Sequence, residues 1–176
     1  MKRFFTVGVF VLAAMAFSVG GPFATHAAEG EVKAEEAKKD IGTKVGQYLA
    51  NFKVKTADGG DFEWKGTAGK PSVFVLIAPT CSLCMKEVAE LQEYATDLAA
   101  KADVYVVVES NAAAAARFAS KYKGDFTMLI DEDFVVMSVA NFRVTPSTIV
   151  VDKDGKITQK FQQYTPGMAK DFVANL

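Results

Sequence analysis

The sequence SVFVLIAPTCSLC, residues 72–84, decides the predicted fold of this chain. Its first part, 72–77, is a continuous run of β-branched, aromatic and aliphatic side chains, which is typical of a strand buried on both faces. A turn follows, and from Cys81 to about Ala100 apolar residues recur every three or four positions, as on one face of a helix. The stretch therefore predicts a buried strand that leads directly into a helix beginning at two cysteines.

This position suits cysteine redox chemistry. Cys81 would lie at the start of the helix, where unpaired backbone N–H groups and the helix dipole favour an anion and lower a thiol pKa. Cys84, one turn later on the same face, could then attack a mixed disulfide formed on Cys81 and release the partner. A zinc site is the first alternative, but zinc normally needs four Cys or His ligands. The second, a structural bridge across one turn, would add little stability, so we interpret Cys81 and Cys84 as a redox disulfide.

Residues 1–27 have the layout of a secretory signal peptide. A short basic region precedes an apolar stretch, and small residues suit cleavage after Ala27. An uncleaved membrane anchor facing outside is the alternative, although the apolar run is short for a span of ~20 residues. Residues 28–44 are highly charged and predict a solvated linker. We therefore expect a periplasmic or otherwise exported protein with one packed domain over 45–176.

Cleavage after Ala27 would remove His26, the only histidine in the chain. A mature protein without imidazole excludes Ser–His and Cys–His nucleophilic pairs and any metal site that requires histidine. The formal net charge of −1 gives no electrostatic footprint for nucleic acid. We accordingly expect no cofactor, no metal and no nucleic-acid partner.

The rest of the packed region alternates strands with helices. Strands are predicted at 51–55, 61–64, 103–108, 126–130, 147–151 and 156–162, and helices at 111–122, at 134–142 and after Thr165. Asn111 would cap the first of these helices, and Asp133 lies near the start of the second. Alternation followed by a late hairpin predicts an α/β domain with a mixed central sheet and helices on both faces.

A second motif lies far down the chain, where residues 142–152 read FRVTPSTIVVD and place a proline directly before a buried strand. With the order of elements around the CxxC pair, this motif resembles the thioredoxin superfamily, most closely its exported TlpA/ResA-like branch, over residues 45–176. The resemblance implies a thioredoxin-like fold with an N-terminal β-hairpin and an inserted helix and strand between Asn111 and Ile130. It also implies a cis peptide between Thr145 and Pro146, beside the two sulfurs, with the backbone of Thr145 pairing with the substrate chain.

Further candidates surround the cysteines. Glu87 stands where ResA-like proteins carry an acidic residue near the active site, three positions after Cys84 on the same helix face, and could accept or relay a proton. A solvated surface glutamate is the alternative. Thr80 replaces the Trp that many relatives carry before the first cysteine, and Leu83 lies in a dipeptide that commonly contains proline. Both are expected at an altered, more apolar substrate surface. Plain thioredoxin has a buried Asp where this chain has Val75.

The resemblance implies an exported thiol–disulfide oxidoreductase whose partners are client protein thiols and disulfides. One client known for this branch is the CxxCH site of apocytochrome c, and a membrane thiol–disulfide exchange partner would re-reduce the cysteine pair. Two alternatives share the scaffold. A peroxiredoxin-like thiol peroxidase would carry Thr or Ser three residues before its reactive cysteine, and Pro further back, where this chain has Ala78 and Phe74. A metal-delivery protein of the Sco type would combine CxxxC with a distant histidine, and a permanently oxidised structural role also remains open.

Overall fold

The computed structural model describes residues 39–66, 69–122 and 126–176. The predicted signal peptide, 1–27, and most of the predicted linker lie outside these ranges. Within them, the helices are too short or too polar to cross a membrane.

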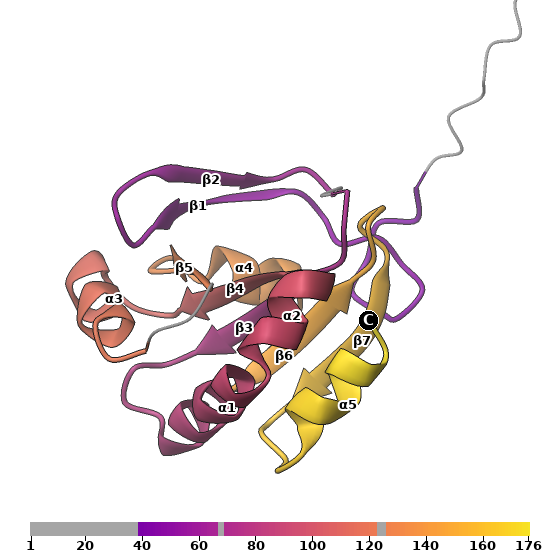
Figure 1. The fold of residues 1–176 in the computed structure, drawn as a ribbon. Coiled ribbons are helices and arrows are strands. Elements are labelled where there is room, and N and C mark those ends of the chain that lie inside the picture. Colours follow the sequence, from indigo (N-terminus) through magenta and orange to yellow (C-terminus); the bar gives the residue numbers. More distant parts are fainter. Residues whose placement is uncertain (1–38, 67–68, 123–125) are drawn as a thin grey trace, which may run out of the picture. The chain divides into compact units, whose positions relative to one another are not determined.

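Seven strands form one mixed sheet (Figure 1). Their bounds are β1 Phe52–Thr56, β2 Asp61–Trp64, β3 Ser72–Ile77, β4 Asp103–Val108, β5 Thr127–Ile130, β6 Ser147–Val151 and β7 Ile157–Gln162. They lie in the order β2-β1-β5-β4-β3-β6-β7, with β3, β4 and β5 parallel and all other neighbours antiparallel. Every residue of β3 is buried, as its uninterrupted apolar run predicts.

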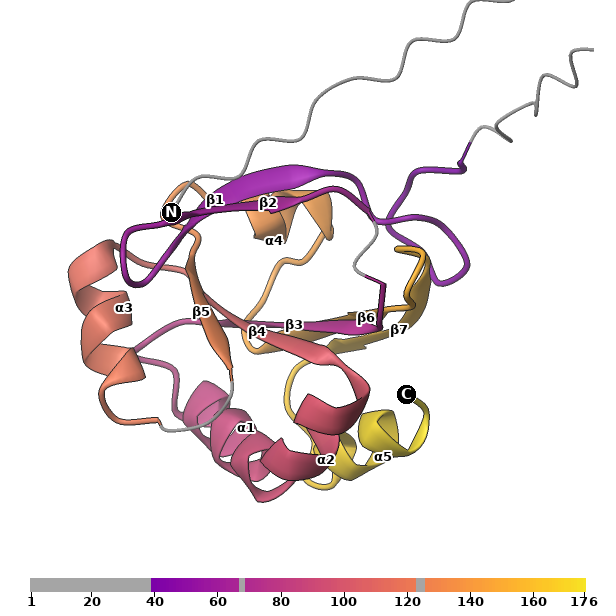
Figure 2. The same ribbon diagram turned by 45° about the horizontal axis from the view of Figure 1, so that its top comes forward.

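Helices cover both faces of this sheet, which confirms the predicted fold class. They are α1 Ser82–Glu93, α2 Ala95–Lys101, α3 Ala112–Ala119, α4 Val135–Val139 and α5 Met168–Ala174. Figure 2 shows α1, α2 and α5 on one side of β3, β4 and β6, and α4 on the other, next to the β1–β2 hairpin.

Two apolar cores result from the alternation of side chains along β3. Val73, Val75 and Ile77 pack with buried residues of α1, α2, α3 and α5. Phe74 and Leu76 pack with α4 and the β1–β2 hairpin. Because both faces of β3 are packed against apolar cores, its last residue, Ile77, has a fixed position. The turn that follows Ile77 and carries the first cysteine is therefore fixed as well.

The predicted helix from Cys81 to about Ala100 is two helices. At Tyr94 the backbone turns away from helical geometry, with φ −106° and ψ 13°. The Tyr94 N–H bonds to the carbonyl of Leu91, three residues back, which tightens the last turn of α1. Leu91 before the break and Leu98 after it are both buried in the same core.

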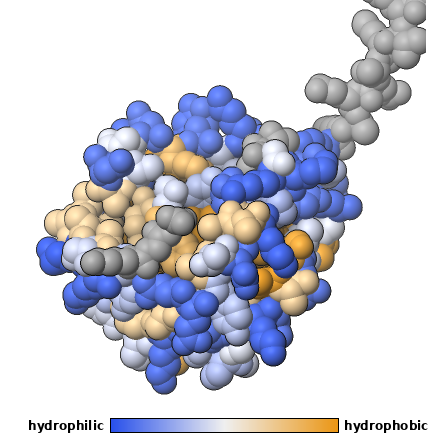
Figure 3. All heavy atoms as spheres, in the orientation of Figure 1, coloured by the Kyte–Doolittle hydropathy of each residue, from blue (hydrophilic) through white to orange (hydrophobic). Residues whose placement is uncertain are grey.

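Two later helices are shorter than predicted. Asn111 caps α3 as expected, accepting from the Ala114 N–H at 3.0 Å, but α3 ends before Tyr122. The exposed residues of α3 are Ala112, Ala113, Ala116 and Arg117, and Figure 3 shows a pale orange area at the left, where α3 lies in Figure 1.

Asp133 lies near the start of α4, as predicted, but the carboxylate that bonds to the first turn of this helix is that of Asp131. The buried carboxylate of Asp131 accepts from the N–H groups of Val136 and Met137 at 3.1 Å. The helix ends before Asn141, which has a left-handed φ of 51°. Asp131 reaches two free N–H groups at the helix start, whereas Asp133 is exposed.

Candidate active site

The two cysteines lie where β3 gives way to α1. Cys81 is the N-cap of α1, with an extended backbone, and its Sγ lies 3.2 Å from the backbone nitrogen of Cys84. The two residues form a disulfide, with their Cα atoms 5.2 Å apart. An N-cap acceptor normally satisfies an orphan N–H of the first turn. A reduced Cys81 in this geometry would receive the same N–H, together with the positive end of the helix, and both favour its thiolate.

The two sulfur-bearing residues differ in accessibility. Cys81 is partly exposed, whereas Cys84 is fully buried. Thr80 is exposed on one side of Cys81, and Leu83 is 42 % exposed on the other. A partner arriving from solvent therefore meets Cys81 first, within a surface to which Leu83 contributes an apolar side chain.

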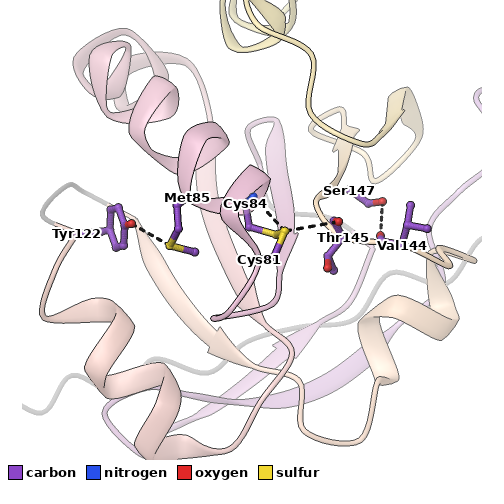
Figure 4. The surroundings of a disulfide bond; sticks show 7 residues. All are labelled: Cys81, Cys84, Met85, Tyr122, Val144, Thr145 and Ser147. Carbon is purple, nitrogen blue, oxygen red and sulfur yellow. Dashed lines mark hydrogen bonds between the residues drawn. A yellow bond between two sulfur atoms is a disulfide. The ribbon is translucent and has the colours of Figure 1, made fainter.

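The loop before β6 lies beside the disulfide, as the resemblance implies. The Thr145–Pro146 peptide is cis. The carbonyl oxygen of Thr145 lies 3.8 Å from the Cys81 Sγ (Figure 4). Antiparallel pairing of β6 with β3 sets Ser147 opposite Leu76, so the loop ends at the same edge of the sheet as the cysteine turn. Pro146 is buried, whereas Thr145 is partly exposed and can present its backbone to a partner.

Glu87 lies inside the protein, so the interpretation of it as a solvated surface residue is wrong. Its side chain is fully buried on the face of α1 that also buries Cys84. Oε1 accepts a hydrogen bond from the Thr148 hydroxyl, and Oε2 has no partner among the described residues. Burial raises the pKa of Glu87 to about 7; the Thr148 hydrogen bond opposes this shift, and the nearby charge of Glu90 adds to it.

Thr148 was not predicted as part of the site. It is the one polar side chain inside the β6 run STIVV that faces α1, and it pairs across the strands with Val75. The sequence did indicate that Thr148 has a hydrogen-bond partner, because a polar residue in an apolar buried strand needs one. The sequence could not name that partner, which lies 61 positions away.

On the other side of the disulfide lies a second pair that the sequence did not indicate. Met85, directly after Cys84, contacts Tyr122, whose hydroxyl lies 2.9 Å from the methionine sulfur. In Figure 4 this pair and Thr145 flank the Cys81–Cys84 bridge from opposite sides.

The candidate site thus combines Cys81, Cys84, Glu87 and the Thr145–Pro146 loop. In the described ranges, no three His, Cys, Asp or Glu side chains are grouped to hold a metal ion.

Comparison with known proteins identifies relatives for this domain. Residues 44–176 match the Redoxin family model. The thioredoxin-like protein YneN of Bacillus subtilis is 29 % identical over 130 residues, covering 69 % of this chain and 73 % of YneN. The thiol-disulfide oxidoreductase ResA of Bacillus cereus is 24 % identical over 119 residues, covering 66 % and 69 %.

Mycobacterial proteins show the same relationship. The soluble secreted antigen MPT53 of Mycobacterium tuberculosis is 30 % identical over 107 residues, covering 61 % of this chain and 62 % of MPT53. The solved structure of dsbF of Mycobacterium tuberculosis superimposes with a TM-score of 0.63 at 26 % identity, covering 70 % of this chain and 93 % of dsbF.

Proposed function

The chain belongs to the Redoxin family and is a TlpA/ResA-like thioredoxin-fold thiol–disulfide oxidoreductase, and from this premise we propose that Cys81 and Cys84 exchange disulfides with client proteins outside the cytoplasm. The difference in exposure between the two cysteines carries the proposal. Only Cys81 is open to a partner, whereas the buried Cys84 lies one turn behind it.

The proposed exchange has two steps. The Cys81 thiolate attacks one sulfur of a client disulfide, an S–S bond forms between Cys81 and the client, and the second client sulfur leaves as a thiolate. Cys84 then loses its proton and attacks the Cys81 Sγ. This step closes the Cys81–Cys84 disulfide and releases the first client sulfur, so two electrons pass to the client. The reverse sequence oxidises a client dithiol.

Glu87 is the proposed base for Cys84. The carboxylate is buried on the same face of α1, and its pKa of about 7 suits proton transfer near neutral pH. Its unpartnered Oε2 has an acceptor position free to take a proton. A fixed carboxylate also disfavours a nearby thiolate, so Glu87 would hold Cys84 protonated until attack is required.

Three residues, Thr145, Thr80 and Leu83, are proposed to contact the client, and Pro146 is proposed to position Thr145. The partly exposed backbone of Thr145 would pair with the client chain, and the buried Pro146 would hold that backbone next to Cys81. Thr80 and Leu83 are exposed on either side of Cys81 and would form the rim of the contact. An apolar rim favours a client segment that carries apolar side chains next to its cysteine.

We further propose an exported location. The layout of residues 1–27 supports it, and so does the likeness to MPT53, which is described as secreted. A membrane exchange partner would reduce the Cys81–Cys84 bridge after each turnover. The CxxCH site of apocytochrome c is one client to test in cytochrome c maturation.

Trapping the mixed disulfide tests the proposal. Cys84→Ser should accumulate a covalent complex through Cys81 with reduced insulin whose cysteines were activated by 5,5′-dithiobis(2-nitrobenzoate), with thionitrobenzoate as the leaving thiolate, whereas Cys81→Ser should form none. Both variants should lose catalytic insulin reduction. If Cys84→Ser retains full steady-state insulin reduction, the assigned roles of the two cysteines are wrong. The equilibrium reduction potential then gives direction: a value near about −270 mV favours a reductase, and one near about −120 mV favours an oxidant.

A further inference from the structure

A groove runs beside the cysteine turn on the side away from Thr145. One wall is the turn 78–80, which leads directly into Cys81, together with Met85. The other wall is α3 with the residues before and after it, including Glu109, Arg117 and Tyr122. Of the residues that line it, Thr80 is already proposed to contact the client.

Glu109 is a half-buried acidic residue among those that line the groove. It directly follows β4, and its N–H donates to the carbonyl of Ile77, so it stands one strand away from the cysteine turn. Its Oε1 is buried and has no hydrogen-bond partner within the described residues. Burial, reinforced by the charge of Asp131, raises the pKa of Glu109 to about 7. Buried polar atoms are nearly always paired, and an acceptor left unpaired suggests that a donor arrives from outside.

The rim of the groove has the opposite charge. Arg117 and Lys121 are exposed on and just after α3, and both line the groove. Neither forms an ion pair with another described residue. The groove therefore presents the carboxyl group of Glu109 as an acceptor and the side chains of Arg117 and Lys121 as cations. These groups complement a peptide segment that has backbone N–H donors and acidic side chains.

The geometry of Figure 4 gives the direction of such a segment. Met85 and Tyr122, which line the groove, lie on one side of the Cys81–Cys84 bridge, and Thr145 lies on the other. A client chain paired with Thr145 and passing over Cys81 therefore continues toward the groove.

We propose that this groove binds the acidic flank of the client polypeptide next to its cystine, with a client N–H donating to Glu109 and a client carboxylate facing Arg117. The inference rests on the proposed function and adds the specificity of the same site. It concerns binding, so the exchange chemistry at Cys81 is unchanged.

The test uses peptides with a single cysteine held as a mixed disulfide with glutathione. Four peptides carry three Glu or three Lys on either the N-terminal or the C-terminal flank, and glutathione disulfide is the reference without a flank. Second-order rate constants are measured with the full-length reduced protein at low ionic strength. On one flank, the Glu peptide should react about fivefold faster than the Lys peptide, as expected for a partly exposed ion pair.

Variants assign this preference to the groove. Arg117→Ala should weaken it, because Lys121 remains, and Arg117→Glu should abolish it, whereas Lys170→Ala, which removes an exposed lysine of α5, should retain it. Glu109→Gln should slow the peptides on that flank about fivefold without slowing glutathione disulfide. Glu132→Gln is the matched exposed control.

The outcomes separate the two proposals. A Glu preference that survives Arg117→Glu, or an equal loss of rate with peptides and glutathione disulfide in Glu109→Gln, overturns the groove assignment. Absence of exchange with every disulfide, in wild type as well, overturns the proposed function instead.

Discussion

Replacing Glu87 by glutamine should change how stability depends on pH. The pKa of Glu87 is about 7 in the folded protein against an ordinary 4.5, and a raised carboxyl pKa means that the folded state binds the proton more tightly. The difference between about 7 and 4.5 corresponds to about 3 kcal/mol. This penalty is absent below pH 4.5, grows between pH 4.5 and 7, and is complete above pH 7.

Glu87→Gln removes this titration but keeps an acceptor for Thr148. The amide adds N–H donors without a partner, which cost about 1–3 kcal/mol at every pH. The variant should therefore be less stable than wild type at pH 5, and relative to wild type it should gain about 3 kcal/mol by pH 8. Urea denaturation of the oxidised proteins between pH 5 and 8 measures the difference without cysteine titration. Glu93→Gln, an exposed change on the same helix, is the control.

The pH dependence of wild-type stability alone cannot identify the contribution of Glu87, because Glu109 also has a pKa of about 7. The informative quantity is the difference between wild type and Glu87→Gln at each pH. If that difference is the same at pH 5 and pH 8, Glu87 does not titrate with a raised pKa, and its proposed role as base for Cys84 loses its support.

Three further predictions concern other parts of the domain. The Cys81 thiol should titrate below the ~8.5 of free cysteine, measured by pH-dependent alkylation of the reduced protein, and a value at or above ~8.5 would contradict activation by the helix start. Phe134→Gly should be more stable to urea than Phe134→Ala by about 1 kcal/mol, because Phe134 has φ 55° and ψ 33°; the opposite order would contradict that backbone geometry. Glu90→Ala should cost about 2–3 kcal/mol, because Glu90 accepts from the Tyr164 hydroxyl and from two backbone N–H groups at the start of α5. It should also lower the pKa of Tyr164, which Glu90 raises to about 12, in an ultraviolet-monitored alkaline titration; an unchanged phenol titration would argue against this contact.

Sequence reasoning predicted the features that depend on local pattern. The apolar run of β3 and its transition into a helix at Cys81 follow from periodicity and helix-end chemistry. The resemblance placed Thr145 beside the disulfide, which local pattern could not do, because the two segments are 64 residues apart. The break at Tyr94 escaped prediction because the apolar spacing continues across it, and periodicity does not register a change of helix axis.

Local pattern could not decide whether the carboxylates are buried, although the resemblance named Glu87 as a candidate near the cysteines. An acidic residue in a charged helix looks the same in sequence whether it faces solvent or the core. Glu87 is buried because its position falls on the stripe of Cys84, Val88 and Leu91, and Thr148 on β6 satisfies one of its oxygens. No sequence pattern indicated a role for Glu109, because its proposed role in binding depends on the groove that it lines together with α3.

The two carboxyl groups differ in where they stand relative to the sulfurs, and this separates their expected roles. Glu87 is fully buried on the face of α1 that also buries Cys84. A client polypeptide cannot contact it there, so proton transfer is the role that we propose for it. Glu109 lies beside the cysteine turn, in a groove open to partners. Val75 leaves the strand without the acidic residue of plain thioredoxin, so the buried acid is supplied from α1 instead. Glu87 is on the same rigid helix as both cysteines, so the proposed base would keep its position relative to Cys84 while client binding along the proposed groove varies.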